Sequence, residues 1–227
     1  MLQEVAQKVN LSPRVLGNWR ALRERAVSSV RIHPTIPNYI VFPWINKVEE
    51  GQDKIDHHAE AQAAEIIKEA FPDASPDYIL AIGNSGLSFG KAVQKQFGKA
   101  QYLEIKKLED NDIARDNKHK YIVAHSYSRN ANLTFELPII PKGKRVLIID
   151  DVAAQAGVGL PIVEAVLRMG AKIDGFGVYF DKEFQQGLEK ISRQMGVLCF
   201  SVIRVAEILQ HENRIHLLDE EKSLQLI

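Results

Sequence analysis

The sequence lacks several features that mark whole classes of protein. Its 227 residues include one cysteine, Cys199, so no intramolecular disulfide framework can form. No apolar run approaches the length that spans a bilayer, and the N-terminus shows no charged segment followed by a hydrophobic stretch. These absences predict a soluble protein of a reducing compartment, most simply the cytoplasm, with no membrane partner.

The sequence also lacks an excess of charge of either sign. Lys and Arg number 29, Asp and Glu number 29, and the pI is about 7.1. This balance argues against a general nucleic-acid binder, which normally carries a positive excess. It leaves room for a local basic site that binds a small anion. With 45% hydrophobic residues, the chain is long enough to bury a full core without metals or disulfides.

Hydrophobic patterning predicts strands that alternate with helices. The predicted strands cover residues 78–82, 102–105, 121–125, 133–137, 145–149, 175–180 and 197–202, and the predicted helices cover 53–70, 86–97, 160–169 and 183–195. The nearly unbroken apolar run 145–149 is typical of a parallel strand that is covered on both faces. The pattern predicts an α/β fold with a mostly parallel central sheet flanked by helices.

Residues 1–35 form a predicted helical N-terminal extension, and residues 36–227 form the main domain. Helical spacing of apolar residues runs from Leu2 to Ala26, with Ser12 and Pro13 as a helix start inside it. The prolines and polar residues of 33–38 end this pattern.

The most informative segment is residues 146–159, where a buried strand runs directly into Asp150 and Asp151. Ligands of open α/β sheets bind outside the carboxyl ends of the strands. The small residues of 154–159 allow backbone N–H groups to approach a phosphate, and the following helix start favours an anion. Acids beside an anion site suit a phosphorylated sugar. The alternative, that both aspartates only cap a turn, ranks lower because burying them would carry an uncompensated desolvation cost.

This segment resembles the 5-phosphoribosyl-1-diphosphate (PRPP) motif of the type I phosphoribosyltransferases. The resemblance implies that Asp150 and Asp151 are the catalytic acids, which hold the ribose hydroxyls, and that a phosphate loop binds the 5′-phosphate. The loop residues are Ala154, Gln155, Ala156, Gly157, Val158 and Gly159. The usual loop is rich in threonine, whereas Gln155 is similar to the early amide residue of bacterial xanthine phosphoribosyltransferases.

The resemblance extends from Ile40 to Gln210. Residues 180–187 are similar to the segment whose lysine lies beside the purine, which implies that Lys182 contacts an oxygen of the base. Residues 42–47 resemble an N-terminal hood, included in the main domain, whose asparagine reads the base; this implies a base-binding role for Asn46. Matches at the diphosphate loop and its basic surroundings imply that pyrophosphate is bound by Asn84, Ser85, Gly86, Lys106, Lys107 and Arg129.

The family resemblance implies a purine phosphoribosyltransferase of the xanthine type, active in purine salvage. Such an enzyme transfers the 5-phosphoribosyl group from PRPP to a purine base and releases pyrophosphate. Mg²⁺ would bind mainly through ligand oxygens and water, as that ion prefers in phosphate sites, which explains why the sequence shows no dense carboxylate cage. The resemblance further implies a homodimer, and the polar stretch 109–120 would close over the site.

Two alternatives remain open. The missing threonines, and Gly83 in place of an acid, are compatible with a catalytically weak or inactive regulatory protein that binds PRPP or a nucleotide. Residues 5–19 faintly resemble a helix-turn-helix, but the extension is short and the net charge is zero, which favours a helical contact or lid. For Lys182, the alternative is a surface ion pair with Asp181 or Glu183.

Overall fold

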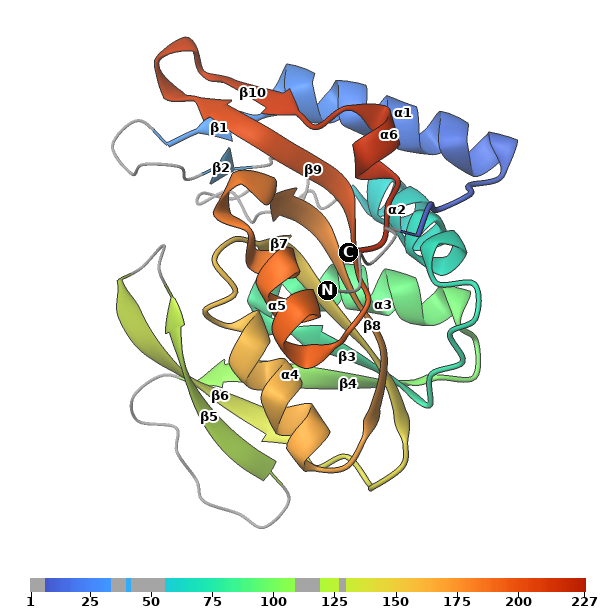
Figure 1. Ribbon diagram of the computed structural model, residues 1–227, viewed down its shortest axis with the longest axis vertical. Helices are drawn as coiled ribbons and strands as arrows, with labels where there is room; N and C mark the ends of the chain where they lie inside the picture. The colour runs from blue at the N-terminus through green and yellow to red at the C-terminus, as the bar shows by residue number, and fades with distance from the viewer. Residues whose placement is uncertain (1–6, 34–39, 42–55, 109–118, 127–129) are drawn as a thin grey trace, which may run out of the picture.

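The computed structural model describes residues 7–33, 40–41, 56–108, 119–126 and 130–227. A central sheet carries the fold, with strands in the order β10-β9-β8-β7-β3-β4-β6-β5 (Figure 1). The five strands at its core run parallel, and the other three pair antiparallel at the two sides. The parallel strands are β3 (Tyr78–Ile82), β4 (Gln101–Leu108), β7 (Arg145–Ala153), β8 (Lys172–Lys182) and β9 (Cys199–Leu209); the others are β5 (His119–Ser126), β6 (Ala131–Pro138) and β10 (Arg214–Leu217).

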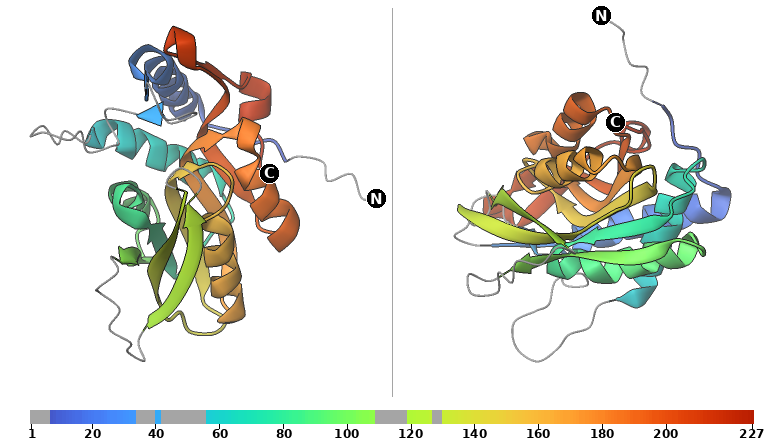
Figure 2. Two further views of the ribbon diagram at one scale, coloured as in Figure 1. Left: turned by 90° about the vertical axis from the view of Figure 1, so that its left-hand side faces the viewer. Right: turned by 90° about the horizontal axis from the view of Figure 1, so that it is seen from below.

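Helices cover both faces of this sheet, as the edge-on views of Figure 2 show. One face packs α1 (Pro13–Ser29), α2 (His57–Ala70) and α3 (Gly83–Gln96) into one apolar core, and the other packs α4 (Gly159–Arg168) and α5 (Gly187–Met195) into a second. Short elements complete the fold: β1 (Arg31–Ile32) pairs with β2 (Ile40–Val41), η1 (Glu183–Gln185) and η2 (Gln210–Glu212) connect larger elements, and α6 (Glu220–Ser223) is the last helix. The predicted α/β class with a mostly parallel sheet is confirmed.

Several predicted boundaries are wrong, and each has a local cause. Residues 7–12 are extended rather than helical, because the Val9 N–H donates to the Leu224 carbonyl and the Leu226 N–H donates to the Gln7 carbonyl. The single helix expected over 183–195 is divided at Gln186, whose φ of 55° is left-handed. The polar stretch 119–120 belongs to β5, whereas 109–118 lie outside the described residues.

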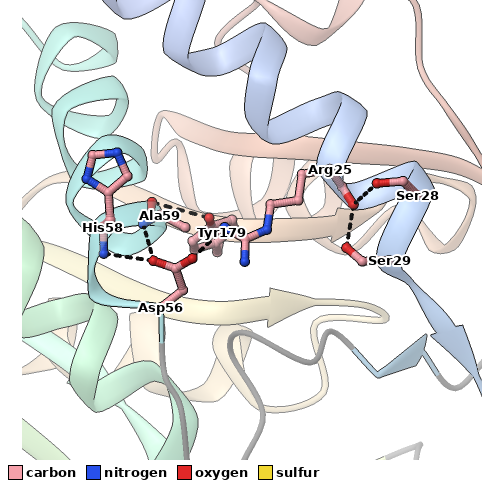
Figure 3. Close-up of polar contacts among 7 residues, drawn as sticks. All are labelled: Arg25, Ser28, Ser29, Asp56, His58, Ala59 and Tyr179. Atoms are coloured by element: carbon pink, nitrogen blue, oxygen red, sulfur yellow. Dashed lines mark hydrogen bonds and ion pairs between the residues drawn. The ribbon is translucent and has the colours of Figure 1, made fainter.

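The N-terminal helix α1 is part of the main hydrophobic core. It begins after Ser12 with Pro13 at its first position, as predicted, and the indole N–H of the buried Trp19 donates to the Val202 carbonyl of β9 at 2.7 Å. Figure 3 shows a second link, the 2.5 Å ion pair between Arg25 of α1 and Asp56, which caps α2 by accepting from the N–H groups of His58 and Ala59. The domain boundary at residue 35 stays a prediction.

Two further predictions concern membrane-spanning segments and the single cysteine. No helix in the described part of the chain is long and apolar enough to cross a membrane. Cys199 is a buried free thiol, as its apolar neighbours indicated, and burial raises its pKa.

Candidate functional site

Asp150 and Asp151 lie at the carboxyl end of β7, in the middle of the parallel sheet. Each carboxylate accepts the N–H of the next residue at 2.9 Å: Asp151 donates to Asp150, and Val152 donates to Asp151. Burial, followed by the adjacent charge of Asp151, raises the pKa of Asp150 well above its ordinary value. The pair therefore favours a ligand that brings hydroxyl donors or positive charge.

The phosphate loop, residues 154–159, follows these acids, and its last residue, Gly159, is the first residue of α4. Ala156 has a left-handed φ of 62°, which turns the backbone sharply. Within the described part of the chain, the N–H groups of Gln155 to Val158 make no hydrogen bond, so they are available to an anion. The N-terminus of the ten-residue α4 adds partial positive charge at the same place.

Gly187, the first residue of α5, supports this loop from behind. A Cβ atom at position 187 would lie 2.1 Å from the Ala154 carbonyl oxygen and 3.1 Å from the Ala156 nitrogen. Only glycine permits this backbone-to-backbone approach. The start of α5 therefore determines where the phosphate loop lies.

The N-terminus of α3 approaches the acids from a second side. Gly83, which replaces an acid of the subgroup, has a left-handed φ of 67°, and Asn84 and Ser85 follow in the first turn. A Cβ at Gly86 would lie 3.4 Å from the Asp150 carboxylate. Two helix N-termini thus flank the aspartate pair, which is an arrangement suited to a ligand with two phosphate groups.

Lys182 ends β8, beside β7, and its neighbour Asp181 is in register with Ala153. Its side chain is buried, which excludes the alternative of a surface ion pair. Burial lowers its pKa to about 8, and the charge of Asp151 acts in the opposite direction. Lys182 therefore ends the strand next to the one that carries the acidic pair, and the charge of Asp151 acts on its ammonium.

The remaining predicted residues are less closely tied to this cluster. Lys106 and Lys107 are adjacent in β4, and successive strand residues point to opposite faces, so both cannot contact one ligand group. In the register of β4 with β6, Lys107 lies opposite the buried Phe135, whereas the Lys106 side chain is exposed. Asn46 and Arg129 lie outside the described residues.

The sequence model of the phosphoribosyl transferase domain family matches residues 51–197, which is more than half of the chain. The chain belongs to this family. The match includes α2, the aspartate pair, the phosphate loop and α5, and it confirms the family that the sequence motif indicated.

Relatives of the phosphoribosyltransferase family agree with this assignment. Xanthine phosphoribosyltransferase 1 of Clostridium perfringens is 30% identical over 134 residues, which are 57% of this chain and 68% of that protein. The adenine phosphoribosyltransferase of Rhodothermus marinus has a TM-score of 0.62 at 18% identity, covering 84% of this chain and 99% of its own. That of Trypanosoma brucei, solved with AMP, pyrophosphate and ribose-5-phosphate, has a TM-score of 0.60 at 18% identity, covering 82% and 79%. At these identities the two structures share the fold.

Sequence reasoning missed two residues that lie around the predicted site. It did not assign Gly187 as the support of the phosphate loop, although a glycine at a helix start is a visible signal of close approach. It also missed Arg204 of β9, which lies 3.5 Å from Asp181, because no local motif accompanies that arginine.

Proposed function

We propose that the protein is a purine phosphoribosyltransferase that transfers the 5-phosphoribosyl group of PRPP to a xanthine-like base and releases pyrophosphate. The observation that carries the proposal is the aspartate pair at the end of β7, followed by open backbone amides and the N-terminus of α4. The aspartates would accept hydrogen bonds from sugar hydroxyls, and the neighbouring backbone amides would donate hydrogen bonds to a phosphate.

The carboxylates of Asp150 and Asp151 are suited to the ribose ring. They would accept hydrogen bonds from its 2′- and 3′-hydroxyls, which offsets the burial and the neighbouring charge that raise the pKa of Asp150. As the bond between ribose C1 and the diphosphate oxygen breaks, positive charge develops on the ring. Two nearby acids would stabilise this charge, a preorganised electrostatic effect that is usually the largest catalytic contribution.

The reaction balances without an oxidant or reductant. The electron pair of the breaking C1–O bond leaves with pyrophosphate, a ring nitrogen of the base forms the new bond to C1, and the nitrogen loses its proton to the surroundings. The phosphate loop would hold the 5′-phosphate, and the start of α3, with Asn84, Ser85 and Gly86, would hold the leaving diphosphate. Arg129 and one of the two β4 lysines, Lys106 or Lys107, are proposed to offset its charge.

The residues fit a Mg²⁺ ion that arrives with its substrate. In the described part of the chain no three His, Cys, Asp or Glu side chains gather where they could hold a metal, whereas Asp150 and Asp151 offer acidic oxygens near the expected diphosphate. When bound, the ion would neutralise charge on the leaving diphosphate. A homodimer, as the family resemblance implies, is part of the proposal.

Lys182 favours a base with an exocyclic oxygen. A lysine ammonium only donates hydrogen bonds, so it pairs with a purine oxygen and not with the amino group at C6 of adenine. Xanthine, hypoxanthine and guanine carry such an oxygen. The similarity to a xanthine phosphoribosyltransferase supports this selection, with Asn46 as the proposed second reader of the base.

The test is a turnover assay with PRPP, Mg²⁺ and each of xanthine, hypoxanthine, guanine and adenine, with nucleotide formation as the readout. We expect product with the oxygen-bearing bases and the highest kcat/KM with xanthine. The variant Asp151→Asn is the matched negative control, because it keeps the size of the side chain. Tight binding of PRPP without product from any base would contradict the proposal and favour the regulatory alternative.

A further inference from the structure

A buried ion cluster lies behind the end of β8, outside the proposed substrate contacts. It consists of Asp181 of β8, Arg204 of β9 and Glu189 of α5. Asp181 is fully buried, and only 7% of the Arg204 side chain is exposed. Arg204 Nη2 lies 2.7 Å from Glu189 Oε1, whereas Arg204 Nε lies 3.5 Å from Asp181 Oδ2, longer than a good hydrogen bond.

This cluster is poorly optimised for stability. Among the described residues, neither carboxylate oxygen of Asp181 has a hydrogen-bond partner, and the Nε of Arg204 has none either. Burial raises the pKa of Asp181 to about 7; Arg204 lowers it, and the charges of Glu189 and Glu183 raise it further. A buried carboxylate without donors is costly, so a stabilising role alone accounts poorly for this arrangement.

A second pair on the same strand shows what a well-bonded pair looks like here. At the start of β8, Asp174 is held by two Arg145 nitrogens at 2.8 and 3.1 Å and also accepts the Ser75 N–H at 3.0 Å. Both pairs join β8 to a neighbouring strand. Only the Asp181 pair lies at the end of β8 that carries Lys182.

The position of the cluster connects it to both substrate subsites. Asp181 precedes Lys182, and because successive strand residues point to opposite faces, holding Asp181 in the interior directs Lys182 to the other face. Glu189 lies in the first turn of α5, two residues after Gly187, which contacts the phosphate loop. One guanidinium therefore holds the segment of the proposed base contact and the support of the phosphate loop.

We propose that Arg204 is a positioning residue for phosphoribosyl transfer: through Asp181 it orients Lys182 toward the base, and through Glu189 it holds α5 against the phosphate loop. The inference rests on the proposed function. It predicts different kinetic effects for the two partners of Arg204. A change at Asp181 should alter the KM for the base, and a change at Glu189 should alter the KM for PRPP.

The experiment compares four variants with the wild type. Asp181→Asn is expected to raise the KM for the base roughly 10-fold and to leave the KM for PRPP near wild type, since a misplacement of about 1 Å can cost up to 10²-fold. Glu189→Gln is expected to raise the KM for PRPP and to leave the KM for the base near wild type. Arg204→Met should raise both constants, and Arg204→Lys should restore part of the loss, because it keeps the charge but not the planar fork.

Arg145→Met is the matched control, since it breaks the pair at the opposite end of β8. It is expected to lower the melting temperature while both KM values stay within about 2-fold of wild type. The inference is overturned if folded Arg204→Met keeps both wild-type KM values, or if Arg145→Met shifts them equally. If Arg204→Met does not fold, the double variant Asp181→Asn with Arg204→Met, which removes two opposite charges together, takes its place under the same criteria.

Failure of the proposed function is distinguishable from failure of this inference. Absence of wild-type turnover with every purine would contradict the function. In that case the affinity of the same variants for ribose-5-phosphate, measured by calorimetry, tests the Glu189 arm. An affinity that falls in Glu189→Gln and Arg204→Met but not in Arg145→Met supports the inference, and an affinity unchanged in all three overturns it.

Discussion

Acidic residues at the two ends of the central sheet stand in opposite electrostatic states. At the amino ends of the strands, Asp77 accepts the Arg145 N–H at 2.9 Å and the Lys144 ammonium at 2.8 Å, and these hydrogen bonds lower its pKa. At the carboxyl ends, burial raises the pKa values of Asp150 and Asp181. The same residue type is satisfied at one end and left short of donors at the other.

This difference separates stability from function. At the amino end, Asp77 and the buried Asp174 each accept hydrogen bonds from a backbone N–H and from a charged side chain. At the carboxyl end, among the described residues, the Asp181 carboxylate and the N–H groups of Gln155 to Val158 have no hydrogen-bond partner, which is destabilising unless a ligand supplies phosphate oxygens to those amides. Substitutions at the two ends should therefore change different measurable quantities.

The largest expected effect tests the carboxyl end directly. Asp151→Asn should lower kcat by about 10²–10³-fold, because one preorganised charge near the developing oxocarbenium ion is lost. Its melting temperature should stay the same or rise, since a repulsive neighbour of Asp150 is removed. Steady-state kinetics and thermal unfolding measure both; wild-type turnover in this variant would refute the catalytic role.

A pair of glycines offers the second test. Gly187→Ala places a Cβ 2.1 Å from the Ala154 carbonyl oxygen and should raise the KM for PRPP about 10- to 100-fold by shifting the phosphate loop. Gly175→Ala, near the amino end, places a Cβ 2.3 Å from the Phe71 ring and should cost about 1–3 kcal/mol of stability without changing that KM. An equal rise of the KM for PRPP in both variants would contradict the proposed difference between the two ends of the sheet.

The third test uses the lowered pKa of Lys182. As the pH rises above about 8, the ammonium loses its charge, so the KM for the base should increase by up to roughly 10-fold per pH unit. Lys182→Arg keeps a charged donor throughout this range and should flatten the profile. A profile that is identical in both proteins would assign the pH dependence to another group.

The smallest expected effect concerns stability against pH. The pKa of Asp181 is about 7 in the folded protein and near 3.8 when unfolded, so the folded state binds the proton more tightly. Its contribution to stability is full below about pH 4 and is lost as the pH rises through 7. Relative to Asp181→Asn, the wild type should lose stability as the pH rises across this window, because the buried carboxylate becomes charged. Denaturant unfolding at pH 5 and pH 8 measures the difference, with Asp174→Asn as the control; a difference independent of pH would contradict the assignment.

Much of the fold follows from local patterns in the sequence. The apolar runs that predicted β3 and β7 are confirmed, because a strand covered on both faces requires consecutive apolar residues. Boundaries that depend on distant partners were wrong. Residues 7–12 have a helical pattern but extend along the C-terminal segment, and strands β1, β2 and β10 are too short for a local signal.

The candidate site divides in the same way. Its local part, Asp150 and Asp151 followed by small residues, is continuous in the sequence, so the motif by itself indicated an acidic pair beside an anion site and the phosphoribosyltransferase family. The nonlocal part was not predictable. Arg204 meets Asp181 from a strand more than twenty residues away, and Gly187 meets Ala154 across the sheet edge; both contacts exist only because β8, β9 and α5 pack together. The chain's residue order thus determined which chemical groups are present, and the tertiary structure decided which of them lack partners, because hydrogen bonding and burial depend on neighbours that the order of residues does not specify.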